Sequence, residues 1–238
     1  MNSEKNSKDK RAKKNKRPSN FLYDFMRITG ALPVLIWMRT RKYRPYGTKT
    51  PRGGVLITAN HTSMCDPVIL LSTFPTRRLN SLATSELFGS PFTRFLFRHM
   101  QCIEVDRGSF SLSTFNETVD RLRLGRAVFI FPEGRISREE PLSAFKSGAA
   151  LMAYRAGTPV LPVYIAPREH WYERQRVVIG ECINIADIVG ERPTSLDFER
   201  ATEHLRERER ALHEYYEELP RVKKKRERLE RKKVNKEE

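Results

Sequence analysis

Residues 54–67 read G-V-L-I-T-A-N-H-T-S-M-C-D-P and join two different kinds of sequence. The first part, 54–59, is a short apolar run with β-branched residues, which is typical of a buried strand. The last part is Asp-Pro. Proline suits the first position of a helix, and the residue before it avoids helical backbone angles. The stretch therefore predicts a strand, a tight turn after Ala59 and a helix that begins at Pro67.

Strand and helix patterns alternate along the rest of the chain. The clearest strand is A-V-F-I-F at 127–131, an amphipathic helix is expected over 110–124, and a helix over 145–157 is closed by Gly157. Further strands are predicted at 81–83, 102–105, 160–165 and 176–183, and further helices at 91–99 and 196–217. This alternation indicates a single α/β domain with a central, mostly parallel or mixed sheet flanked by helices.

Basic residues are concentrated at the two ends of the chain. The formal net charge is +16 over 238 residues; the first 17 hold eight Lys/Arg against two acids, and the last 18 hold ten against four. Such ends bind polyanions, either nucleic acid or an anionic lipid surface. We therefore expect a disordered basic tail at 1–19, a membrane-interfacial helical segment at 20–45, an α/β domain at 46–195, a charged helix at 196–220 and a basic tail at 221–238.

Residues 21–38 form the most apolar stretch, F-L-Y-D-F-M-R-I-T-G-A-L-P-V-L-I-W-M. Asp24, Arg27 and the helix-kinking Pro33 interrupt it, so it is a poor membrane span. Its basic flanks favour a helix in the membrane interface, where Lys and Arg meet anionic head groups. A helix packed on the domain's own core and a true span remain open alternatives.

The cysteines indicate the compartment. Cys65, Cys102 and Cys182 are too few and too scattered for a disulfide framework, and the N-terminus lacks the pattern of a secretory signal. Both features favour a reducing, cytoplasmic setting.

The local chemistry of the turn at 60–67 allows several roles for its side chains. His61 and Asp66 can act as a general base and its orienting carboxylate, but only if the chain turns between them, because five helical residues would place them on different faces. Asp66 can instead cap the following helix. Cys65 can be a nucleophile, or can join His61 and Asp66 at a metal, although no second His/Cys pair has zinc spacing. Met64 and Cys65 are expected to turn inward as apolar filling.

A second polar turn, P-E-G-R-I-S at 132–137, follows the strand at 127–131. Gly134 allows close backbone approach or a positive φ, and Arg135 offers a planar fork that suits phosphate. Because α/β sheets place ligand sites at the carboxyl ends of their strands, this turn and the one at 60–67 are both site candidates.

The two turns together resemble the glycerolipid acyltransferase family, the lysophosphatidic acid acyltransferases. The resemblance runs from about residue 50 to residue 183. Its motifs are N-H-x-S-x-x-D-P at 60–67, a motif close to I-x-V-D-R at 103–107, F-P-E-G at 131–134, F-K-x-G at 145–148 and V-L-P-V at 160–163.

This resemblance implies a reaction and a membrane-bound substrate. A fatty acyl group would pass from acyl-CoA or acyl carrier protein to the free hydroxyl of a lysophospholipid, with lysophosphatidic acid as the first expectation. His61 would be the general base and Asp66 would hold its tautomer, so that no acyl-enzyme, metal or cofactor is expected. The enzyme would work on the cytoplasmic face of an anionic membrane, as a peripheral or monotopic protein.

The resemblance also implies the acceptor site. Arg107 would bind the acceptor's phosphate, while Glu133 and Gly134 would shape its pocket. Arg135 stands one position earlier than the arginine of many family members, and Thr84 stands where many carry a lysine. The first of these departures is similar to relatives that act on lysophosphatidylethanolamine, which remains the alternative acceptor.

Two functions of other kinds remain open. The basic ends would suit a nucleic-acid-binding module, but neither has interleaved aromatic residues for base stacking, and no nucleic-acid partner is predicted. A thioesterase would pass the acyl group to water instead of to a lipid.

Overall fold

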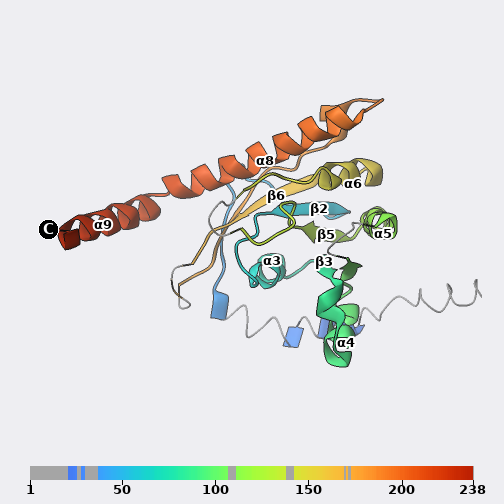
Figure 1. The fold of residues 1–238 in the computed structure, drawn as a ribbon, viewed down its shortest axis with the longest axis horizontal. Helices are drawn as coiled ribbons and strands as arrows, with labels where there is room; N and C mark the ends of the chain where they lie inside the picture. The colour runs from blue at the N-terminus through green and yellow to red at the C-terminus, as the bar shows by residue number, and fades with distance from the viewer. Residues whose placement is uncertain are drawn as a thin grey trace, which may run out of the picture.

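The computed structural model describes residues 21–25, 28–29, 37–106, 111–137, 142–168, 170 and 173–237. Within them the chain forms a seven-stranded sheet with helices on both faces (Figure 1). The strands are β1 (Arg41–Tyr43), β2 (Val55–Ala59), β3 (Leu79–Thr84), β4 (Ile103–Val105), β5 (Ala127–Ile130), β6 (Val160–Ile165) and β7 (Arg176–Ile179). The predicted α/β class is confirmed.

The sheet is mixed, with the strand order β1-β7-β6-β2-β5-β3-β4. Neighbouring strands are parallel except β6 and β7, which are antiparallel. β2 lies at the centre between β6 and β5, and all five of its residues are buried. Burial on both faces explains why 54–59 reads as a continuous apolar run.

Helices cover the two faces of the sheet. Figure 1 shows α6 (Gly148–Ala156) and α8 (Ser195–Glu218) on one side, with α3 (Asp66–Thr73) and α4 (Pro91–His99) on the other. The strand residues divide accordingly, since Ile57 packs in the same cluster as α3 while Leu56 packs with α5, α6 and α8. The remaining helical elements are η1 (Ser85–Phe88), α5 (Leu112–Arg123), α7 (Ala186–Val189) and α9 (Pro220–Glu237).

The helical segment predicted at 20–45 is wrong in its last part. Residues 21–25, 28–29 and 37–38 are helical, but Arg41–Tyr43 form β1, which pairs in parallel with β7. A three-residue charged strand at a sheet edge has no sequence period of its own, and its partner lies more than 100 residues away. The tail predicted at 1–19 and half of the 21–38 stretch lie outside the described residues.

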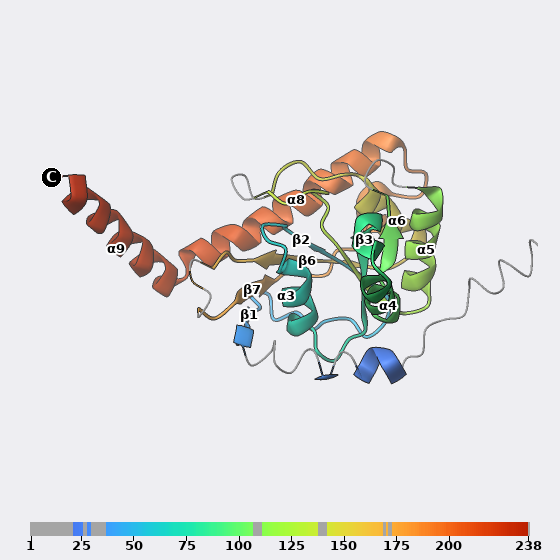
Figure 2. The same cartoon turned by 60° about the horizontal axis from the view of Figure 1, so that its bottom comes forward.

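Other predicted boundaries differ for local reasons. The strand expected over 176–183 ends at Ile179, because Gly180 packs tightly against Pro162 on β6, and Ile183 only bridges to Val160. The helix predicted from 145 begins at Gly148, since the backbone N–H of Lys146 donates to the carbonyl of Pro132. The basic segment 221–238 is helical over most of its length, and α9 extends away from the domain (Figure 2).

None of the helices in the described part of the chain combines the length and the hydropathy that crossing a bilayer requires.

Gly54 allows β2 to pack tightly against the end of α5. A Cβ at this position would lie 2.1 Å from the carbonyl oxygen of Leu122, whereas a Cβ on Gly53 would meet nothing within 4 Å. We expect Gly54→Ala to lower the free energy of unfolding by about 1–3 kcal/mol, the usual range for overpacking, and Gly53→Ala to leave it almost unchanged. Urea unfolding of both variants measures this difference; equal effects would contradict the close contact.

Candidate active site

The two predicted turns meet at one edge of the sheet. β2 ends at Ala59 and β5 ends at Ile130, and the two strands are parallel neighbours, with Thr58 opposite Ile130. The segments that follow them, 60–65 and 131–137, therefore lie side by side. This is the carboxyl edge at which open α/β sheets place their sites.

His61 and Asp66 form a close pair in the first turn. Nδ1 of His61 lies 2.9 Å from Oδ2 of Asp66, whose side chain is 1% exposed. The same oxygen accepts from the backbone N–H groups of Thr62, at 2.7 Å, and Ser63, at 2.8 Å. A carboxylate held in this way requires Nδ1 of the imidazole to carry the proton, which leaves Nε2 as the basic nitrogen.

The alternative in which Asp66 caps the following helix is wrong. α3 begins at Asp66 itself, with Cys65 at the N-cap position and no capping hydrogen bond from its side chain. The carboxylate instead accepts from N–H groups that precede the helix, because the chain between His61 and Asp66 folds back over it. Asp66 thus stabilises the turn that brings it to the imidazole.

The two sulfur side chains of this turn point in different directions. Cys65 is partly buried and packs against the core cluster on the α3 side, as predicted. Met64 is 66% exposed, so the expectation that it turns inward is wrong.

Glu133 joins the second turn to the first. It is buried, and its Oε1 accepts from the backbone N–H of His61 at 3.1 Å, while its Oε2 accepts from the hydroxyl of Ser143 at 3.0 Å. The backbone N–H of Ser137 also donates to the carbonyl of His61, at 2.8 Å. Both polar backbone atoms of His61 are therefore held by the second turn.

Phe131 supports the imidazole from the side. Its ring stacks on that of His61 with centroids 4.0 Å apart and an angle of 12° between the planes. Together with the bond to Asp66, this contact restricts the imidazole to one orientation.

Two basic side chains lie at the rim of the second turn. Gly134 has a φ of +68°, and the position that a Cβ would take there is 2.9 Å from Nζ of Lys146. Arg135 and Lys146 are both exposed. The positive φ expected at Gly134 is confirmed, and Lys146 crosses the face that the missing side chain leaves open. Arg107 lies outside the described residues, so its phosphate role remains a prediction.

Asn60 is a positioning residue that the sequence reading did not identify. It is fully buried, its Oδ1 accepts from the backbone N–H of Ile165 at 2.7 Å, and its Nδ2 donates to the carbonyl of Ile165 at 3.0 Å. These bonds fasten the end of β2 to the end of β6 immediately before His61. The sequence feature that could have identified Asn60 is an amide side chain directly after a buried strand.

Glu209 is a second residue that the sequence reading missed. It lies on α8 in the stripe that packs on the sheet and is fully buried, near Thr58. Neither carboxyl oxygen has a hydrogen-bond partner within the described residues. Burial raises the pKa of Glu209 well above its usual value; the nearby hydroxyl of Thr58 opposes this rise, and the charge of Glu133 adds to it. Its sequence signal was an acid in the apolar stripe of Ala201, Leu205, Leu212 and Tyr216.

We expect stability to depend on pH through Glu209. Its folded pKa is raised, so the folded state keeps a proton that the unfolded chain releases above its own pKa of about 4.3. The free energy of unfolding should fall as pH rises between these two pKa values, by up to about 1.4 kcal/mol per pH unit. Glu209→Gln should remove this part of the slope, and Glu207→Gln, at an exposed site on the same helix, should not. Urea unfolding across this pH range measures it; identical slopes in all three proteins would contradict the assignment.

Comparison with known proteins points to one family. A family model described as "Acyltransferase" matches residues 42–166, just over half of the 238 residues, and this range contains both turns. Among curated proteins, the 1-acyl-sn-glycerol-3-phosphate acyltransferase of Borreliella burgdorferi is 30% identical over 143 residues, 58% of this chain and 57% of the relative. The lyso-ornithine lipid O-acyltransferase of Pseudomonas aeruginosa is 31% identical over 121 residues, 50% of this chain and 46% of the relative.

The match spans about half the length of these curated relatives. Among solved structures, the 1-acyl-sn-glycerophosphate acyltransferase of Thermotoga maritima is similar with a TM-score of 0.58 and 20% identity, over 79% of this chain and 78% of that one. At this identity the likeness shows the shared fold.

Proposed function

Because the chain belongs to the acyltransferase family, we propose that it transfers a fatty acyl group from a thioester donor to the free hydroxyl of a lysophospholipid. The observation that carries this proposal is the His61–Asp66 pair, joined at 2.9 Å and held by the second turn through Glu133. A buried carboxylate behind an imidazole is the arrangement that general-base activation of a hydroxyl requires.

The reaction follows from this geometry. Nε2 of His61 takes the proton of the acceptor hydroxyl while the hydroxyl oxygen attacks the thioester carbonyl. Asp66 stabilises the imidazolium that forms. When the tetrahedral intermediate collapses, the carbon–sulfur bond breaks and the imidazolium returns its proton to the departing thiolate. The products are the acylated lipid and a free thiol, and His61 is again neutral.

The acceptor is proposed from the relatives and from the charges at the rim. The Borreliella relative is named for 1-acyl-sn-glycerol 3-phosphate and the Pseudomonas relative for a lyso-ornithine lipid, so a lysolipid is the common class. Lysophosphatidic acid is the first choice here, because Arg135 and Lys146 are exposed cations beside the site and Arg107 is expected to join them. Lysophosphatidylethanolamine is the alternative, and the donor is acyl-CoA or acyl carrier protein.

The protein is proposed to act at a membrane surface, on the cytoplasmic face. Phe21 and Phe92 are 79% and 73% exposed. Segment 21–25 is fastened to the domain because Tyr23 donates to the carbonyl of Leu79 and Asp24 pairs with Arg78 at 2.6 Å. Figure 1 places this segment on the same lower side of the molecule as α4. Phe25 in this segment and Phe95 on α4 are exposed as well, and so is Ile28, shortly after the segment.

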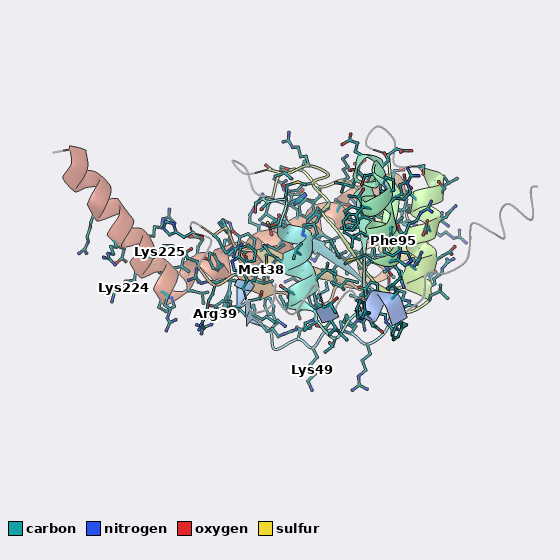
Figure 3. All side chains as sticks on the ribbon, turned by 90° about the horizontal axis from the view of Figure 1, so that it is seen from below. Met38, Arg39, Lys49, Phe95, Lys224 and Lys225 are labelled. Carbon is teal, nitrogen blue, oxygen red and sulfur yellow. The ribbon has the colours of Figure 1, made fainter. Side chains whose placement is uncertain are left out.

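Basic side chains accompany this apolar surface. Figure 3, viewed from below, shows Phe95 and Arg39 over the molecule and Lys49 at its outline, and both basic residues are exposed. Apolar rings can enter the acyl boundary while cations meet anionic head groups, so a peripheral or monotopic association is proposed.

A panel assay tests the proposal. Purified protein is incubated with radiolabelled acyl-CoA or acyl carrier protein and with different lysophospholipids, and the lipid products are separated. We expect label in phosphatidic acid when lysophosphatidic acid is present. Release of free fatty acid at the same rate without any lysophospholipid would instead indicate a thioesterase. In parallel, liposome flotation without RNA retention is expected; RNA retention without flotation would favour nucleic-acid binding.

A further inference from the structure

A cavity of about 430 Å³ lies away from His61, between β1, the segment before β7 and the start of α9. It is strongly basic, because its lining holds four arginines and a single carboxylate. That carboxylate, on Glu173, is already paired with Nζ of Lys225 at 2.7 Å. The lining residues are Arg41, Tyr43, Glu173, Arg174, Arg176 and Arg221.

The fold brings these arginines together from three distant segments. Arg41 on β1 lies opposite Arg176 on β7, and the backbone N–H of Arg41 donates to the carbonyl of Gln175. The junction of α8 and α9 packs Leu219 and Val222 in one cluster with Tyr43, which places Arg221 at the cavity. The charges are thus fixed by packed elements rather than carried on a loose tail.

Two contacts hold individual guanidinium groups. The guanidinium carbon of Arg41 lies 5.2 Å from the centroid of the Tyr43 ring. Nη1 of Arg176 lies 3.5 Å from the hydroxyl of Tyr216, so this group is held only weakly on that side. Arg174 and Arg221, which also line the cavity, are both exposed. Their forks therefore remain accessible to a ligand from solvent.

Four guanidinium groups around one cavity repel one another, and an anion with more than one negative charge relieves that repulsion. Guanidinium also presents paired N–H donors that match the oxygens of phosphate. We propose that this basic pocket is a binding site for phosphate groups that together carry two or more negative charges.

The site is distinct from the proposed reaction centre. β1 is the third strand from β2, and three strand spacings amount to about 14 Å. Both sites nevertheless lie at the end of the sheet where β2 and β6 finish. Val177 pairs with Ile165 at the end of β6, and Arg176 comes directly before Val177. Ile165 is in turn bonded to Asn60, the residue before His61. The phosphates could belong to a soluble nucleotide carrier or to a lipid head group, and the proposal does not depend on the acyl-transfer reaction.

The experiment compares the full chain with two double variants of equal charge change. Arg174→Gln/Arg221→Gln removes two pocket arginines that lie outside the sheet, and Arg192→Gln/Arg210→Gln removes two exposed arginines elsewhere. One arm titrates each protein with coenzyme A and with pyrophosphate by calorimetry. The other arm measures flotation with phosphatidylcholine vesicles that contain or lack phosphatidic acid. Thermal unfolding confirms that all three proteins are folded.

We expect the pocket variant to bind its probe at least about tenfold more weakly than the wild type, with the control variant close to the wild type. A loss confined to the soluble probes identifies a nucleotide or diphosphate ligand, and a loss confined to phosphatidic acid vesicles identifies a lipid head group. Equal behaviour of the two variants in both arms, or no binding of either probe by the wild type, would overturn the proposal and leave these arginines as solvated surface charge.

Discussion

Replacing His61 with alanine is expected to lower the rate of acyl transfer by about 10²- to 10⁴-fold, the usual contribution of a positioned general base. Without the imidazole, no group within the described site can take the proton of the acceptor hydroxyl from the place where Nε2 stands. The donor and acceptor contacts are unchanged, so the Michaelis constants should move little. Initial rates at saturating acyl donor measure the effect, and thermal unfolding checks that the protein remains folded.

Cys65→Ser provides the matched control for His61→Ala. It alters the same turn and exchanges only a thiol for a hydroxyl, and Cys65 packs against the core and takes no part in the proposed reaction. Most of the activity should therefore remain. Loss of activity in Cys65→Ser together with survival of His61→Ala would replace the general base with a thiol nucleophile.

Asp66→Asn is expected to have an effect of similar size. An amide oxygen can still accept from the N–H groups of Thr62 and Ser63, but a neutral amide does not stabilise an imidazolium. In serine proteases the comparable exchange lowers kcat by about 10⁴-fold. We expect kcat to fall by about 10²- to 10⁴-fold here, with a much smaller change in KM.

The alternative for Asp66 is a purely structural role, and stability separates the two. Kinetics are measured together with urea unfolding, and Asp120→Asn, at an exposed carboxylate on α5, serves as the control. If Asp66→Asn kept kcat and only lowered the free energy of unfolding, the carboxylate would serve the turn alone. A large fall in kcat with a loss of stability of no more than about 1–3 kcal/mol supports the catalytic pair.

The central part of the fold was predictable because its signals are local. β2, β5 and β6 are buried on both faces, so each gives an unbroken apolar run, and Gly157, with a φ of +62°, ends α6 as expected. β1 was not predictable, since three charged or aromatic residues form a strand only by pairing with β7.

The candidate site was predictable only in part. A strand end followed by Asp-Pro shows that His61 and Asp66 can meet, but the path of the intervening turn decides whether the carboxylate faces the helix or the loop. The sequence order does not state that β2 and β5 are neighbours, because β3 and β4 come between them along the chain. Asn60 is recognised by its two bonds to Ile165 on β6, and Glu209 by its burial near β2, and both observations require the packed structure.

The hydrogen bond between Glu133 and the backbone N–H of His61 has a consequence for the order of events during protein synthesis. Glu133 lies 72 residues beyond the imidazole whose backbone it holds. A nascent chain that has not yet released β5 from the ribosome already contains His61 and Asp66 but lacks the segment that orients them. The proposed proton-accepting centre is therefore assembled only when the second half of the domain has emerged, so the proposed reaction requires a chain extended at least to Glu133.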